Sequence, residues 1–172
     1  GNFSIGELPP RTSIIGDDAF VVTVNSPVDD GQSLDFVISV REDERRWDSG
    51  YSLVVEAPDL FLEYWALSDT LHGDGDGCIE PWEHLCLHGL WRNNGSDDVV
   101  SPVISISFPP DSWMRAVKNT ITAPLLPAKG AIVIDGEIEL FVREYAPPFA
   151  EVTAYLSLSG LNITARVETL SV

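Results

Sequence analysis

Hydrophobic and polar residues alternate along most of the chain, and this pattern predicts β-strands rather than helices. In the stretch Glu137–Arg143, Ile138, Leu140 and Val142 fall on one side of an extended backbone and the acidic residues on the other. No stretch carries apolar residues at helical spacing over three turns, and the 12 prolines punctuate the apolar runs. The pattern therefore favours antiparallel sheets with one buried and one hydrated face.

About ten strands are predicted, with turn-type residues every ~8–15 positions, as in a β-sandwich. The expected strands are Ala19–Val24, Ser33–Val40, Tyr51–Ala57, Leu60–Leu67, His84–Trp91, Val99–Ser107, Trp113–Lys118, Ala131–Glu144, Ala150–Leu158 and Asn162–Val172. The first two are expected to pair as a hairpin with a long loop. The mixed charge run Arg41–Arg46 is expected to be a solvated loop or a short helical turn.

Charge narrows the range of partners. The 172 residues include 27 acidic and 10 basic side chains, which gives a formal net charge of −17. Nucleic-acid binding depends on Lys and Arg contacts to phosphate, and here the two Lys and eight Arg form no stripe. Anionic membrane surfaces are disfavoured for the same reason, and no apolar run of 18 residues predicts membrane insertion. With 44% hydrophobic residues, a packed domain is expected instead.

The sequons indicate an extracellular or cell-surface location. Three of the six asparagines, Asn2, Asn94 and Asn162, stand in N-x-Ser/Thr, which favours an N-glycosylated secreted protein over coincidence. The chain begins at Gly1 without an initiator Met, as expected of a mature or excised piece.

The two cysteines, Cys78 and Cys86, lie eight residues apart with Pro81 between them. A disulfide between them would close a short loop and stabilise the fold by about 2.6 kcal/mol. The alternative is that both lie on one continuous strand, where their Cα atoms are too far apart to be bridged. A zinc site is disfavoured because the chain has no C-x-x-C pair.

The segment His72–Glu83 carries the pattern of a calcium-binding loop. It alternates acidic residues with glycine, and carboxylate oxygens on a Gly-hinged loop are the ligands that a hard cation prefers. The predicted metal ligands are Asp74, Asp76 and Glu83, completed by the Cys78 carbonyl and Glu80. The first position of the loop holds His72 instead of Asp, so Asp69 or a water would have to substitute. The alternative is a tight acidic turn without a metal.

A resemblance to a known kind of domain follows from this loop and the residues after it. The residues that carry it are Asp74–Glu83, Asn93–Gly95, Val103–Ser107, Pro109–Pro110, Trp113, Pro124–Gly130 and Pro147–Phe149. The order resembles immunoglobulin-like domains with the pattern DGDGxxEPGE…NxG in large secreted or surface proteins, closest to a fungal and eukaryotic domain of unknown function. The resemblance covers residues 51–172 and implies an immunoglobulin-like β-sandwich. Trp82 stands where the pattern has glycine.

Residues 1–50 lie outside this resemblance. They are expected to be N-terminal strands, either the first strands of the same domain or an assembly segment. The apolar triplets Phe3–Ile5 and Ser13–Ile15 could each supply a strand to the sheet edge of a neighbouring subunit.

Two functional classes are compatible with these features. The first is a non-catalytic structural or adhesive glycoprotein subunit that associates with itself or with other extracellular proteins, in one form as a filament built by strand donation. The alternative is a carbohydrate-binding module that uses Trp47 and Trp82, the two tryptophans expected in loops. An enzyme is disfavoured because no nucleophile elbow or phosphate-binding loop is present in the sequence.

Overall fold

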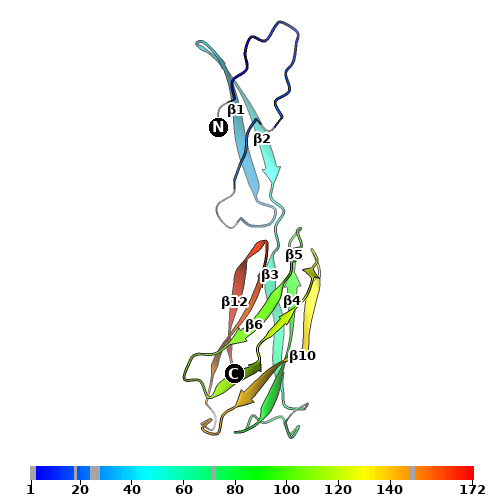
Figure 1. Ribbon diagram of the computed structural model, residues 1–172, viewed down its shortest axis with the longest axis vertical. Helices are drawn as coiled ribbons and strands as arrows, with labels where there is room; N and C mark the ends of the chain where they lie inside the picture. The colour runs from blue at the N-terminus through cyan, green and yellow to red at the C-terminus, as the bar shows by residue number, and fades with distance from the viewer. Residues whose placement is uncertain (1–2, 18, 24–27, 71–72, 148–149) are drawn as a thin grey trace.

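The computed structural model describes residues 3–17, 19–23, 28–70, 73–147 and 150–172. Within these ranges the chain is built from strands, turns and loops (Figure 1). The strands are β1 Ser33–Glu42, β2 Arg45–Val54, β3 Leu60–Ser68, β4 His84–Asn93, β5 Val99–Val100, β6 Val103–Ser107, β7 Met114–Lys118, β8 Thr120–Thr122, β9 Leu125–Leu126, β10 Ala131–Val142, β11 Thr153–Gly160 and β12 Ile163–Ser171. Nowhere in the described ranges does a helix have the length and apolarity needed to cross a membrane.

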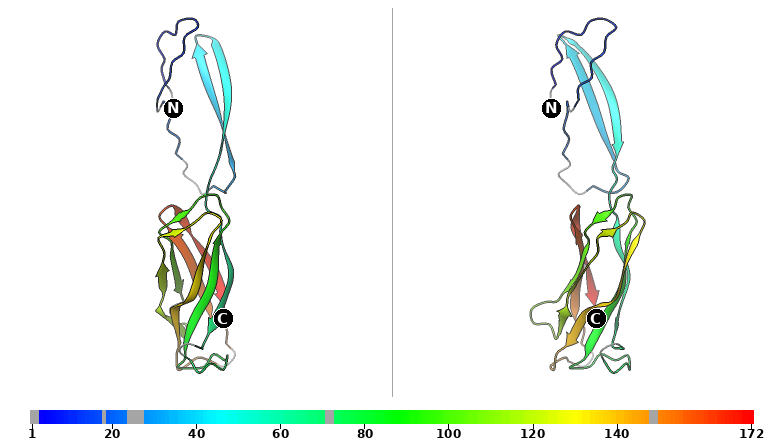
Figure 2. Two further views of the ribbon diagram at one scale, coloured as in Figure 1. Left: turned by 90° about the vertical axis from the view of Figure 1, so that its right-hand side faces the viewer. Right: turned by 45° about the vertical axis from the view of Figure 1, so that its right-hand side comes forward.

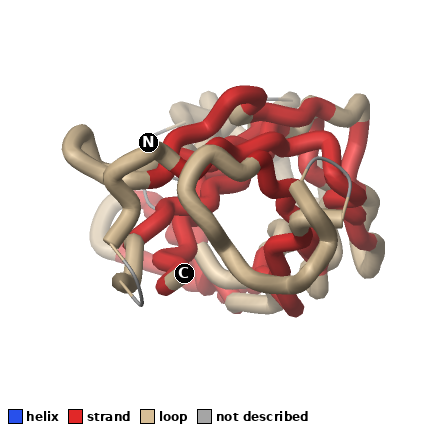
Figure 3. Tube along the Cα trace, turned by 90° about the horizontal axis from the view of Figure 1, so that it is seen from below, coloured by secondary structure: helices blue, strands red, loops and turns tan. Residues whose placement is uncertain are grey.

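Two four-stranded sheets form the larger part of the molecule. One has the order β3-β4-β10-β7 and the other β12-β11-β6-β8, and the strand pairs are antiparallel. Side chains from both sheets meet in one hydrophobic core, with Trp91, Leu140 and Leu156 completely buried. Figure 3 views the chain along its long axis, with the strands in red and the loops and turns in tan. The predicted all-β sandwich fold is confirmed.

The sandwich strands differ in detail from the predicted ones. The expected strand Val99–Ser107 is divided into β5 and β6, because Ser101 adopts a left-handed backbone conformation with φ of 51° and Pro102 follows it. Strand β10 contains a bulge between Asp135 and Ile138, where Gly136 has φ of 86°. The short strands β8 and β9 were not expected, because runs of two or three residues carry no periodicity.

A separate two-stranded hairpin, β1–β2, projects beyond one end of the sandwich (Figures 1 and 2). Its strands pair over ten residues each, from Ser33 opposite Val54 to Glu42 opposite Arg45. Two expectations are therefore wrong: β1 pairs with β2 and not with the described part of Ala19–Val24, residues 19–23, and the charge run Arg41–Arg46 forms the hairpin tip within the strands. Strand β2 also crosses the expected boundary between residues 50 and 51.

The N-terminal segment, residues 3–23, runs beside the hairpin as a long loop (Figure 1). Residues 19–23 have no strand structure, while Val24 lies outside the described residues. The triplets Phe3–Ile5 and Ser13–Ile15 do not pair with the sandwich of the same chain either, since neither of its sheets contains a strand from residues 3–17. The large apolar side chains of this segment are exposed: Phe3, Ile5, Leu8, Ile14, Ile15, Phe20, Val21 and Val22.

The base of the hairpin is hydrogen-bonded to the nearest sandwich loop. The Asp30 carboxylate accepts hydrogen bonds from Ser96 Oγ and from the Ala57 backbone N–H at 3.1 Å. These two bonds hold the pKa of Asp30 below its ordinary value of 3.8. Ser96 N–H also donates to the Ala57 carbonyl at 3.1 Å. Between them, Gly95 lies so close to the connecting chain that a Cβ would stand 2.1 Å from Ala57 O and 2.4 Å from Asp59 N.

Substitution of Gly95 by alanine is therefore expected to destabilise the junction. The neighbouring atoms belong to the backbone and cannot rotate away, so the unfolding free energy should fall by about 1–3 kcal/mol. Chemical denaturation measures it. Gly50→Ala is the control, because nothing lies within 4 Å of its Cβ position. Equal stability of the two variants would contradict this account of the junction.

Candidate functional sites in the acidic loop and the apolar hairpin

The acidic loop, defined as residues 69–83, connects β3 to β4 at the end of the sandwich opposite the hairpin (Figure 1). Its carboxylates accept hydrogen bonds from the backbone of the same loop. Asp69 Oδ2 accepts from Gly77 N–H at 2.8 Å, and Asp76 Oδ1 accepts from Cys78 N–H at 2.7 Å. Asp74 Oδ1 accepts from Asp76 N–H at 3.1 Å. The loop is thereby folded around its own acidic side chains.

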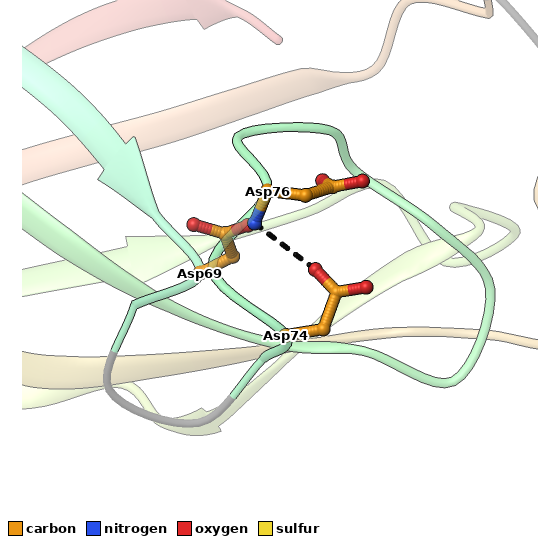
Figure 4. A group of neighbouring side chains, drawn as sticks. All are labelled: Asp69, Asp74 and Asp76. Carbon is orange, nitrogen blue, oxygen red and sulfur yellow. Dashed lines mark hydrogen bonds between the residues drawn. The ribbon is translucent and has the colours of Figure 1, made fainter.

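Three carboxylates converge in this loop (Figure 4). One oxygen each from Asp69, Asp74 and Asp76 lies within 4.8 Å of the others. Asp69 is buried, with 5% of its surface exposed, while the other two are exposed. Two of the predicted metal ligands are thus brought together, and Asp69 joins them as the alternative to His72, whose position lies outside the described residues.

The other predicted ligands take different positions. The half-buried Glu83 closes the loop: its Oε2 accepts from Glu80 N–H at 3.0 Å and its Oε1 from Asp74 N–H at 3.4 Å. The Glu80 and Cys78 side chains are exposed and lie outside the three-carboxylate cluster. Three oxygen ligands are fewer than the six to eight that calcium takes, so backbone carbonyls and water would have to supply the rest.

Glycines allow the chain to make this turn. Gly75 and Gly77 have φ of 80° and 83°, a region that other residues enter only at a cost. At Gly73 a Cβ would lie 2.1 Å from Glu83 Oε1. Trp82 is the exception: its φ is 75° although it is not glycine, and its ring packs edge-on to Phe141 at 6.3 Å between centroids. Glycine adopts such a positive φ without strain, whereas Trp82 does not.

Cys78 and Cys86 are free thiols in the structure, so the predicted disulfide is not formed. Cys86 is completely buried within β4, whereas Cys78 is exposed on the acidic loop. The negative charge of Asp76, with a hydrogen bond to it, raises the pKa of the Cys78 thiol, and burial raises that of Cys86. Both groups are therefore protonated at neutral pH.

The predicted glycosylation sites differ in how their side chains are used. Asn94 is exposed on the loop after β4. Asn162 is also exposed, but its Oδ1 accepts from Val100 N–H at 2.9 Å and its Nδ2 donates to Asp98 O at 2.7 Å. Asn162 thus joins the β11–β12 turn to the start of β5. Asn2 lies outside the described residues.

The hairpin has one apolar and one polar face, because residues paired across an antiparallel ladder share a face. Along one face Leu34 pairs with Leu53, Phe36 with Tyr51, and Val40 with Trp47, with Ile38 opposite Ser49. We call the large side chains of this face the hairpin apolar face: Leu34, Phe36, Ile38, Val40, Trp47, Tyr51 and Leu53. Five of these seven are exposed, namely Ile38, Val40, Trp47, Tyr51 and Leu53. Leu34 and Phe36 are half-buried.

The opposite face of the hairpin is hydrogen-bonded through its polar side chains. Asp48 Oδ1 accepts from Ser39 Oγ and Arg46 Nε, both at 2.6 Å, and these contacts hold the pKa of Asp48 below 3.8. On the same face Asp35 accepts from Ser52 Oγ at 2.5 Å. The charged groups of the strands are therefore kept off the apolar face except at its tip, where Glu42 pairs with Arg45.

The two tryptophans expected to bind sugar do not form a common platform. Both are exposed, Trp47 by 51% and Trp82 by 64%. Trp47 lies on the hairpin, whereas Trp82 precedes β4 at the far end of the sandwich. Trp47 belongs to a strand and not to the expected loop, so its exposure is a property of the hairpin apolar face.

The sequence did contain a signal for this face. From Trp47 to Leu53, Trp47, Tyr51 and Leu53 alternate with Asp48, Gly50 and Ser52, which is the period of a half-buried strand. The charged residues 41–46 before this pattern suggest a loop that ends a strand, whereas in the structure they form the tip of the hairpin.

A cleft of about 870 Å³ separates the N-terminal segment from the hairpin. Phe3, Phe20, Val21 and Val22 line one side, and the residues from the hairpin are Phe36, Val37, Ile38, Ser39, Arg41, Tyr51 and Leu53. The segment therefore stands beside the hairpin without filling the space against it.

The Cys78 thiol provides a test of the electrostatics of the acidic loop. Because the charge of Asp76 is the largest cause of the raised pKa, Asp76→Asn should lower that pKa and increase the thiolate fraction. Alkylation of Cys78 between pH 7 and 9 should then become faster, and buried Cys86 should not react. Asp111→Asn, an exposed substitution outside the loop, is the control. An unchanged alkylation profile in Asp76→Asn would contradict the assignment.

Comparison with known proteins adds no family to this picture. No protein-family model matches the chain, and no curated protein matches it either. The functional interpretation therefore depends on the fold and the geometry of the two sites.

Proposed function

We propose that the protein is a non-catalytic structural subunit that associates with further copies of itself through the N-terminal segment and the hairpin. The observation that carries this proposal is the uncovered hairpin apolar face. An isolated two-stranded hairpin is marginally stable in water, and it becomes stable when its apolar face packs against another layer. Within one copy, five large side chains of this face remain exposed instead of packing against such a layer.

The area of the exposed surface is consistent with a protein interface. Five large apolar side chains that are each about half exposed present on the order of 500 Å². The exposed apolar residues of the N-terminal segment contribute a similar amount. Together they exceed the largest apolar patch of an ordinary monomer and reach the ~800 Å² that each partner contributes to a standard interface.

The sandwich, by contrast, has edges that discourage pairing with another chain. Edge strand β8 has only three residues, and edge strand β3 is interrupted by a register shift between Leu62 and Tyr64. On edge strand β12, Arg166 and Glu168 pair with Leu158 and Leu156, and so stand on the core-facing side. Inward-facing charges and short edges are the usual protection against association. We therefore propose that the sandwich supports the hairpin and is not itself the assembling part.

We further propose an extracellular or cell-surface location, with N-linked glycans, and an immunoglobulin-like sandwich. The three sequons and the DGDGxxEPxE pattern support these points. In this proposal calcium binds the acidic loop at Asp69, Asp74 and Asp76, with the predicted residues Cys78, Glu80 and Glu83 shaping the remainder of the loop. The convergence of three carboxylates, one of them buried, supports a hard cation there.

Self-association is tested by placing a charge on the hairpin apolar face. Leu53→Asp should weaken self-association at least tenfold, about 1.4 kcal/mol, because association would bury the carboxylate. Sedimentation over a range of concentrations measures it, and electron micrographs of the same samples show whether the product is a particle or a filament.

Val54→Asp is the matched control, since Val54 is the next residue on β2, more exposed, and on the opposite face. It should associate like the parent chain. A parent chain that remains monomeric up to millimolar concentration, or equal weakening by both substitutions, would contradict the proposal.

Calcium binding is tested by thermal unfolding. At a calcium concentration ten times its dissociation constant, the folded state should gain about 1.4 kcal/mol. Asp69→Asn should remove this gain while retaining an oxygen for Gly77 N–H, and Asp111→Asn should keep it. A melting temperature that responds to neither calcium nor chelator would exclude the metal site.

A further inference from the structure

The free edge of β1 is the part of the hairpin best suited to accept another strand. Strand β1 is ten residues long and pairs only with β2 among the described strands, so its other edge has unpaired backbone groups. The cleft lies along this edge, because its lining includes neighbouring residues from both faces of β1, such as Ile38 and Ser39. The middle of β1 lacks the features that protect the sandwich edges: residues 36–40 contain no charge, proline or bulge.

Residues 19–23 have the composition of a strand that lacks a partner. The sequence Ala-Phe-Val-Val-Thr has high β-propensity, yet these residues form no backbone hydrogen bond with other residues that the structure describes. Val21 is 87% exposed, and Phe20 and Val22 are more than half exposed. In an extended conformation, three consecutive apolar residues point to both faces, so this strand requires an apolar layer on each side.

The cleft supplies these two layers. The hairpin apolar face borders it on one side and the resident N-terminal segment on the other. No backbone hydrogen bond joins the described residues of the resident segment to β1, and an open space of about 870 Å³ is lined by both. A strand that enters this space can therefore pair with β1 and contact apolar side chains on both sides.

The geometry points to a second copy of this chain as the occupant: residues 19–23 of one copy enter the cleft of another and add a strand to the free edge of β1. This inference rests on the proposed self-association and names its acceptor, which is the hairpin and not the sandwich. The interaction combines main-chain hydrogen bonds with apolar contacts, as in other cases of strand addition. Arg41 is the one charged residue among those that line the cleft, so no carboxylate there repels a second chain of net charge −17.

The inference is tested on the full chain with Val21→Asp. Because Val21 is almost fully exposed in one copy, the substitution should leave folding intact and weaken self-association at least tenfold. Leu161→Asp is the matched control: Leu161 is 81% exposed on the β11–β12 turn, and its substitution should have no effect. Val22→Pro, which removes a backbone donor, should weaken association as well if strand pairing is involved.

Hydrogen exchange distinguishes pairing between copies from pairing within one copy. Amides of residues 19–23 and of β1 should become protected as concentration rises, and the synthetic peptide of residues 16–23 should inhibit association. Protection that does not depend on concentration would overturn the inference. So would undiminished association of Val21→Asp in a chain that Leu53→Asp disrupts, which would leave the proposed function standing. A parent chain that never associates would overturn both.

Discussion

A sheet with one apolar face must be covered by a second layer, and this requirement organises the whole molecule. In the sandwich it is met within one chain, since side chains from both sheets bury one another almost completely. In the hairpin it is not met, because β1 and β2 form a single layer whose apolar face stays exposed. The same alternation of residues thus produces a closed core at one end and an open surface at the other. The proposed function follows from this difference.

The hydrogen-bonded junction gives the open surface a fixed base. Asp30, Ser96 and Ala57 connect the start of the hairpin to the loop after β4, and Gly95 permits the close approach. The buried Asn93, the last residue of β4, holds this loop: its Oδ1 accepts from Gly95 N–H and its Nδ2 donates to Asp97 O. Because the two bonds of Asp30 join residues that are 27 and 66 positions apart in the sequence, they connect the hairpin to the sandwich although the two share no sheet. A rigidly held apolar face loses less entropy on association than a flexible one.

Much of the sandwich could be predicted from the sequence, because each strand there has one buried face and alternates clearly, as in Ile138, Leu140 and Val142. The hairpin could not, because pairing is decided by contacts that alternation does not encode. Ala19–Val24 had the composition of a partner for β1, yet the chain turns at residues 43–44 and pairs β1 with Arg45–Val54 instead. At the acidic loop, spacing identified Asp74 and Asp76, and it left Asp69 or a water as the substitute for His72. The structure brings Asp69, which directly follows β3, to the other two carboxylates, a choice that spacing alone does not make.

The proposed pairing of residues 19–23 with β1 of another copy gives a role to a neutral apolar surface in a sequence so rich in negative charge. Repulsion between copies acts over about 8–10 Å at physiological ionic strength, so it opposes close approach everywhere charged residues dominate. Contacts along residues 36–40 of β1 involve uncharged side chains and backbone groups, whose gain on burial does not depend on charge. In the proposed association, acidic surfaces elsewhere would limit contact to this one region. Net charge would then suppress unspecific contacts, while the apolar face permits a specific one.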